Sequence, residues 1–240
     1  MQHFRKKIAL VTGASRGLGF HTALQLAQQG ALVVATARQK RSLDGLAQEL
    51  EKLGAPHLLV ALELQDANCV KALANLIRSR WGVLDILVAN AGILGALSPV
   101  ESYEISQFEE VIRTNFLGNF FLIQAFADLL KKSAAGRAVF LTSGAANNAR
   151  PKWSGYGSSK AALNLLVRSW AKENEDKNIK INLVSPGATR TAMRAEAMPQ
   201  EDPSSLPSPE KISSSFLHLL SENCQITGRI FDCRKNDFTE

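Results

Sequence analysis

Residues 8–19 have the sequence Ile-Ala-Leu-Val-Thr-Gly-Ala-Ser-Arg-Gly-Leu-Gly. The first five residues form a short apolar run that is typical of a buried strand, and a helical pattern follows the glycines through Gln29. Glycines at such a junction let the backbone approach a pyrophosphate, whose charge is stabilised by the free N–H groups and the dipole of the helix N-terminus. A plain tight turn is the alternative, but a position between a strand and a helix is the context that phosphate binding requires. The stretch therefore predicts a phosphate-binding loop.

Short apolar runs alternate with amphipathic stretches along the rest of the chain. Strands are expected at residues 8–12, 32–37, 58–62, 86–89, 138–142, 179–184 and 228–231, and longer helices at about 105–130 and 156–171. Gly30, Gly54 and Gly82 are expected at helix ends, where a left-handed residue is useful. Alternating strands and helices form a parallel sheet covered on both faces. The predicted fold class is α/β, a Rossmann-like, doubly wound sheet of about seven mostly parallel strands with helices on both faces.

The chain shows no linker and no internal repeat, so we expect a single domain over residues 1–240. Residues 192–210 break the alternation, because they contain four prolines together with several serines and acidic residues. We expect this stretch to be irregular and to form, with the turn before it, a substrate loop or lid at about 189–210.

Composition narrows the function classes. The formal net charge is +6, but lysines and arginines are scattered without interleaved aromatic residues, so nucleic-acid binding is not expected. No apolar stretch approaches the ~20 residues of a membrane span, and no signal peptide is recognisable. The three cysteines form no CxxC pair and the four histidines have no ligand spacing. We therefore expect a cytoplasmic protein without a metal site.

The end of the second predicted strand bears on the choice of dinucleotide. An acidic residue there binds the ribose 2′-OH of NAD, whereas a nearby arginine accommodates the 2′-phosphate of NADP. This chain has Ala37 followed by Arg38, and Arg16 lies in the glycine loop. A guanidinium can bind a phosphate through two hydrogen bonds. The pair of arginines, with no acid beside them, favours NADP(H).

Tyr156 and Lys160 are four residues apart in a predicted helix, which places both side chains on one face. A nearby ammonium stabilises a phenolate and lowers its pKa toward the range useful for acid–base catalysis. Ser143 ends the fifth predicted strand, so its hydroxyl is expected at the carboxyl edge of the sheet, where folds of this kind bind ligands. There it can hydrogen-bond a substrate oxygen.

The TGxxxGxG spacing, the YxxxK pair, Ser143 upstream and Asn115 in the preceding long helix resemble the short-chain dehydrogenase/reductase family, in its short single-domain branch. The resemblance covers nearly the whole chain. It implies that Tyr156 is the general acid/base and that Ser143 orients the substrate oxygen. It further implies that Lys160 lowers the Tyr156 pKa and binds the nicotinamide ribose. Asn115 would hold, through its backbone, a water that links Lys160 to a proton relay.

The same resemblance implies further cofactor contacts. Asn90-Ala91-Gly92 is similar to the family's NNAG, with Ala89 in place of the first Asn, and Glu63-Leu64 stands where Asp-Val contacts the adenine. The turn from Pro186 to Thr191 is similar to PGxVxT, which contacts the nicotinamide carboxamide, with Thr189 in place of the branched apolar residue. The complete expected cofactor set is Gly13, Ser15, Arg16, Gly17, Leu18, Gly19, Arg38, Glu63, Leu64, Asn90, Ala91, Gly92, Tyr156, Lys160, Pro186, Gly187, Thr189 and Thr191.

The lid segment resembles that of a group of bacterial oxidoreductases of this family. Arg190 and Arg194 lie on its near side. One hypothesis is that one of them meets an anionic group of the substrate, and the alternative is that both pair with Glu196 or Glu201 at the surface. The C-terminus lacks the Gly-Gly usual in the family near the end of the last strand. A homodimer or homotetramer is expected.

These features together predict an oxidoreductase that transfers a hydride between NADP(H) and a carbonyl or alcohol substrate. A catalytically silent NADP(H)-binding sensor of the same fold is the alternative, although such a protein has no need of the Tyr156–Lys160 pair. An epimerase or dehydratase of the family's extended branch is disfavoured by the chain length and by the glycine spacing.

Overall fold

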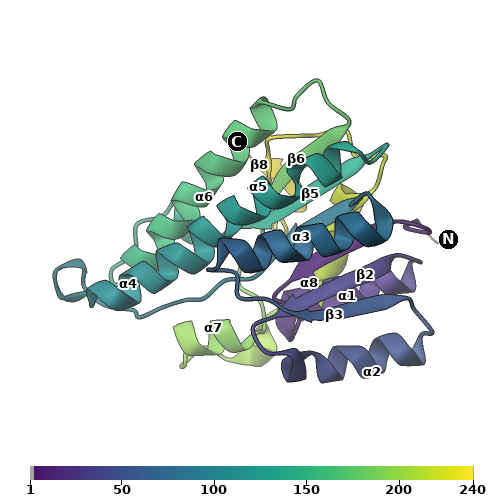
Figure 1. Ribbon diagram of the computed structural model, residues 1–240. Helices are drawn as coiled ribbons and strands as arrows, with labels where there is room; N and C mark the ends of the chain where they lie inside the picture. The colour runs from purple at the N-terminus through teal and green to yellow at the C-terminus, as the bar shows by residue number, and fades with distance from the viewer. Residues whose placement is uncertain (1–2, 240) are drawn as a thin grey trace.

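The computed structural model describes residues 3–239 and shows one continuous eight-stranded sheet (Figure 1). The strand order is β3-β2-β1-β4-β5-β6-β7-β8, in which all neighbours are parallel except β7 and β8. The strands are β1 Ile8–Thr12, β2 Leu32–Ala37, β3 His57–Ala61, β4 Ile86–Ala89, β5 Gly136–Leu141, β6 Ile179–Ser185, β7 Ile230–Asp232 and β8 Asp237–Thr239. The order reverses direction between β1 and β4, which is where folds of this kind bind ligands.

The seven expected strands are confirmed, and β1, β2 and β4 have the expected bounds. The eighth strand, β8, was not expected, because three largely polar residues give no hydrophobic pattern. It pairs with β7 through a tight reversal at residues 233–236.

The helices cover both faces of the sheet. They are α1 Gly17–Gln28, α2 Asp44–Lys52, α3 Ala67–Trp81, α4 Ile105–Ile112, α5 Gly118–Lys131, α6 Ser154–Lys172, α7 Ala192–Ala197 and α8 Pro209–Phe216. Side chains of α3, α5 and α6 share one buried core with the sheet, and those of α1, α2 and α8 share the other (Figure 1). Within residues 3–239, no helix has the length and the apolar character needed to span a bilayer.

The structure confirms one helical prediction and corrects another. The helix expected at 105–130 is present as α4 and α5, which are joined without a break by a π-helical turn at Arg113–Leu117 that was not expected. The lid segment is not irregular throughout, since α7 forms within it. The Thr191 hydroxyl accepts a hydrogen bond from the Arg194 N–H and so caps α7 at its start.

The helix-end prediction for glycines is confirmed. Gly82 ends α3 in the left-handed region at φ 73°, and its N–H donates to the Arg78 carbonyl. Gly30 and Gly54 lie in the same region directly after the ends of α1 and α2.

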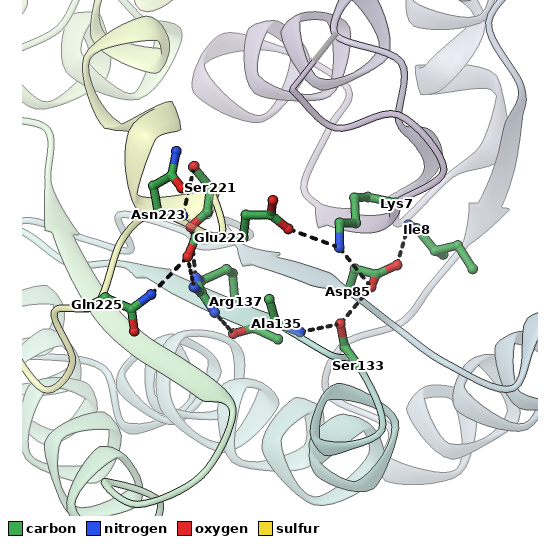
Figure 2. Close-up of polar contacts among 11 residues, drawn as sticks. Lys7, Ile8, Asp85, Ser133, Ala135, Arg137, Ser221, Glu222, Asn223 and Gln225 are labelled. Atoms are coloured by element: carbon green, nitrogen blue, oxygen red, sulfur yellow. Dashed lines mark hydrogen bonds and ion pairs between the residues drawn. The ribbon is translucent and has the colours of Figure 1, made fainter.

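A polar network closes the amino edge of the sheet (Figure 2). The buried Asp85 carboxylate, just before β4, accepts hydrogen bonds from the Ile8 N–H at 2.9 Å and from the Ser133 hydroxyl at 2.6 Å. Lys7 lies beside it, with Nζ 4.0 Å from Asp85 Oδ1 and 3.8 Å from Glu222 Oε2.

Arg137, near the start of β5, completes this network with a side chain that contacts no acid directly. Its guanidinium donates to the carbonyls of Gly136, Ser221 and Glu222 at 2.8, 2.9 and 2.8 Å (Figure 2). Burial lowers the pKa of Arg137. The bonds to Ser221 and Glu222 tie the loop before β7 to β5 in the sheet.

Candidate functional site

A cavity of about 480 Å³ lies at the carboxyl edge of the sheet, between the ends of the central strands and α7. Ser143, Tyr156 and Lys160 line it together with most of the expected cofactor residues. These are Gly13, Ser15, Arg16, Gly17, Leu18, Arg38, Glu63, Leu64, Asn90, Ala91, Gly92, Pro186, Gly187, Thr189 and Thr191. Gly19 and Asn115 are buried behind the cavity wall and do not line it.

The glycine loop has a shape that larger residues would not allow. Gly13 has φ 65°, and a Cβ there would lie 2.8 Å from the Cα of Ala91. A Cβ on Gly19 would lie 2.3 Å from the Gly13 carbonyl oxygen, so α1 packs directly against the loop at this point. Gly19 therefore lets α1 pack closely against the loop, whereas Gly17 and Leu18 line the cavity.

The start of α1 presents donors to the cavity. The helix begins at Gly17 without a side-chain cap and without an acidic residue in its first turn. Its first N–H groups and the positive end of its dipole are therefore available to an anion. Arg16 and Arg38 are exposed on the same part of the lining. This donor set fits a dinucleotide with a phosphorylated ribose.

Asn90 holds the loop in place. Its Nδ2 donates to the carbonyls of Thr12 and Gly13, both at 3.0 Å. The Thr12 hydroxyl accepts from the N–H groups of Asn90 and Ala91, both at 3.1 Å. Thr12 was not among the predicted site residues, although it begins the glycine motif in the sequence.

Tyr156 and Lys160 both project from α6, as their spacing predicts, and Lys160 Nζ lies 5.8 Å from the centre of the Tyr156 ring. Nζ donates to the Leu141 carbonyl at 2.8 Å. Ser143 follows β5, and its hydroxyl accepts from the Ala145 N–H at 3.2 Å.

The acid–base properties of this group differ from the expectation. Burial raises the pKa of Tyr156, and a hydrogen bond with Ser143 opposes this only in part. Burial also lowers the pKa of Lys160 to about 8. The expected lowering of the Tyr156 pKa is therefore corrected: desolvation of the phenol is the largest effect on this pKa and raises it.

Asn115 lies in the π-helical turn and is fully buried. Its carboxamide exchanges two hydrogen bonds with the Ile93 backbone, both at 2.9 Å, and Nδ2 also donates to Ser159 Oγ at 3.0 Å. Its backbone carbonyl accepts from Asn119 Nδ2 at 2.7 Å. Asn115 thus connects Ile93, in the loop after β4, to Ser159 on α6. The water expected at the Asn115 backbone stays a prediction.

Gly92 keeps space open beside these residues. A Cβ at this position would lie 3.1 Å from Asn115 Oδ1 and 3.6 Å from Lys160 Nζ. Any side chain there would fill the space between the two polar groups.

Apolar residues also line the cavity. They include Leu94, Trp153 and Met193, and the Trp153 ring meets the Tyr156 ring edge to face at 6.0 Å. None of the three was predicted, although Trp153 stands only three residues before Tyr156. Leu94 and Met193 carry no signal in the sequence, because ordinary apolar residues in loops or short helices are common.

The lid arginines differ from each other. Arg194 forms two hydrogen bonds of 2.6 Å with the Glu201 carboxylate, so the expected surface pairing holds for this residue and its partner is Glu201. This pairing lowers the pKa of Glu201 and raises that of Arg194. Arg190 is exposed and lines the cavity.

Comparison with known proteins gives a consistent result. A sequence model of the short chain dehydrogenase family matches residues 7–202. The uncharacterized oxidoreductase YciK of Escherichia coli is 35% identical over 233 residues, which cover 95% of this chain and 92% of that protein.

Two solved structures are similar over nearly their whole length. A short chain dehydrogenase of Shigella flexneri complexed with NADP has a TM-score of 0.93 and 33% identity, covering 98% of this chain and 100% of the other. Another from Escherichia coli, complexed with NADPH, has a TM-score of 0.92 and 34% identity, covering 98% and 99%.

Proposed function

This chain belongs to the short-chain dehydrogenase family, and on that premise we propose that it is an NADP(H)-dependent carbonyl reductase or alcohol dehydrogenase. The observation that carries the proposal is the position of Ser143, Tyr156 and Lys160 on one cavity whose far end carries Arg16 and Arg38. An acid–base group and a phosphate-binding end in one cavity are what a reductase of this kind needs.

The glycine loop and the start of α1 would hold the diphosphate, and Arg16 and Arg38 would hold the 2′-phosphate. Ala37 supports this choice, because an acid at the end of β2 would favour the free 2′-OH of NAD. Two similar solved proteins were complexed with NADP and NADPH. When bound, the cofactor supplies or accepts the hydride.

Tyr156 donates the proton to the carbonyl oxygen of the substrate. Because burial raises its pKa, the phenol is protonated at neutral pH and suits the direction of carbonyl reduction. The Ser143 hydroxyl donates a hydrogen bond to the same oxygen and orients it. Lys160 stabilises the phenolate that remains.

We also propose that the chain self-associates through α4, α5 and α6. Ile105, Phe120 and Leu165 on these helices are 77%, 36% and 71% exposed, and contact with a second copy would remove their apolar surface from water. Sedimentation analysis should give a dimer or a tetramer, and a monomer at micromolar concentration would exclude this proposal.

The function is tested by titrating the protein calorimetrically with NADPH and NADH and then following NADPH oxidation with a panel of ketones. We expect NADPH to bind about tenfold more tightly or better, because two charge-assisted contacts to a phosphate are lost with NADH. Tyr156→Phe should abolish oxidation while the dissociation constant of NADPH stays within about twofold. Tight binding without turnover of any carbonyl would favour a silent sensor, and a preference for NADH would contradict the cofactor assignment.

A further inference from the structure

We propose, on the basis of the function above, that Arg190 binds a carboxylate of the substrate, so that the preferred substrates are oxo acids. The charged side chains of the cavity fall into separate groups. Arg16, Arg38 and Glu63 line the end near β1, β2 and β3, and Lys160 lines the middle. Arg190 and Arg194 line the end next to α7.

Only one of the two arginines at the α7 end is available. Arg194 is held by both oxygens of Glu201, and the two side chains are only 21% and 26% exposed. A bidentate pair of this kind has little capacity for a further anion. Arg194 therefore fixes the chain between α7 and the turn that follows it.

Arg190 has no such partner. Within residues 3–239, no carboxylate oxygen lies within 4.0 Å of its guanidinium, and its side chain is exposed. Its backbone is fixed, because its N–H donates to the Pro207 carbonyl at 3.0 Å and the next residue, Thr191, caps α7. The structure thus holds the start of this side chain firmly and leaves the guanidinium free to bind.

The remaining lining shows what sort of ligand fits. Leu94, Trp153 and Met193 give the cavity apolar lining, Trp153 packs against Tyr156, and Arg190 adds a cation to the same cavity. A substrate with an apolar body, a carbonyl group at Tyr156 and an acidic group would use each of these surfaces.

The test compares oxo acids with their methyl esters, using the pairs levulinate and methyl levulinate, and benzoylformate and methyl benzoylformate. Each pair keeps the carbonyl and removes the charge. Arg190→Gln should lower kcat/KM for the acids about tenfold or more, mainly through KM, because a charge-assisted hydrogen bond is lost. The esters should change less than about twofold. Arg78→Gln, an exposed arginine of α3 outside the cavity, is the matched control and should change neither.

Equal losses for acids and esters would overturn the proposal. Weaker binding of NADPH to Arg190→Gln would also overturn it, because the arginine would then contact the cofactor.

If the wild-type protein reduces none of the four compounds, that result counts against the proposed function but does not test the carboxylate site. The site is then decided by titrating benzoylformate calorimetrically into the NADP⁺-saturated protein. Binding that Arg190→Gln weakens about tenfold supports the site, and the absence of binding overturns it.

Discussion

At the amino edge of the sheet Arg137 is 2% exposed and donates three hydrogen bonds to backbone carbonyls (Figure 2). At the carboxyl edge Lys160 is 4% exposed and donates one. Both are buried cations whose pKa is lowered by burial. The two sites differ in how many hydrogen-bond acceptors the chain supplies to the buried cation. At the amino edge the chain itself satisfies the charge, so the edge is closed. At the carboxyl edge the partners are incomplete and a cavity adjoins them, which is the arrangement of a binding site.

The comparison predicts that removing Arg137 has the largest effect on stability. Arg137→Met leaves the carbonyls of Gly136, Ser221 and Glu222 without their charged donor. We expect the free energy of unfolding to fall by about 2–4 kcal/mol, since hydrogen bonds to a charged group are worth about 1.5–3 kcal/mol each and the relief of a buried charge offsets part of the loss. Urea unfolding measures it.

The control is Arg229→Met, which removes an exposed arginine from the same region and should change stability by less than about 0.5 kcal/mol. The kcat of folded Arg137→Met should match wild type, because the residue lies at the edge opposite the cavity. A variant with normal stability and reduced kcat would reverse the roles that we assign to the two edges.

Removal of Lys160, unlike that of Arg137, should increase the stability of the protein. Its pKa is lowered from 10.5 to about 8, so between these values the unfolded chain binds a proton that the folded chain does not. Stability therefore rises with pH across this window, and below about pH 8 the buried charge costs the folded state on the order of 3 kcal/mol. Lys160→Met removes this cost and loses the bond to the Leu141 carbonyl.

The variant should thus be more stable than wild type by about 1–2 kcal/mol at pH values below about 8, with little or no activity. The advantage should disappear as the pH approaches about 10.5, where wild-type Lys160 is neutral in both states. Urea unfolding of both proteins at about pH 7 and about pH 10 measures the difference in their free energies of unfolding. A difference that does not change with pH would contradict the pKa assigned to Lys160.

The sequence predicted the sheet well because its signal is local. The runs that became β1, β2 and β4 are continuous, apolar and bounded by turn residues, so even their bounds were predicted. The π-helical turn at Arg113–Leu117 was missed because apolar residues continue on both sides of it at helical spacing. Helix α7 was missed because the prolines around it outweighed a short helical stretch whose cap and ion pair lie within the segment.

In the candidate site, too, features with a local sequence signal were predicted and features that depend on tertiary packing were not. Motif residues such as Gly13, Tyr156 and Lys160 line the cavity, and they were predicted from their motifs, from the strand and helix around them and from the family resemblance. The direction of the Tyr156 pKa was wrong because burial depends on the packed structure. The amino-edge network was not predicted at all, since Arg137 meets Ser221 and Glu222 from positions more than 80 residues away.

Lys7 should give the smallest effect and the finest test of the comparison. Its ammonium lies 4.0 Å from Asp85 Oδ1 and 3.8 Å from Glu222 Oε2, at the limit of an ion pair, and the Glu222 side chain is 67% exposed. Lys7→Met should therefore lower the free energy of unfolding by at most about 1 kcal/mol. Adding salt to about 0.5 M should reduce the part of this difference that comes from the exposed Glu222, because exposed pairs are screened more than buried ones. A loss as large as that of Arg137→Met would mean that charge pairing holds the amino edge together, because the Lys7→Met substitution leaves every bond of Arg137 to its three carbonyls intact.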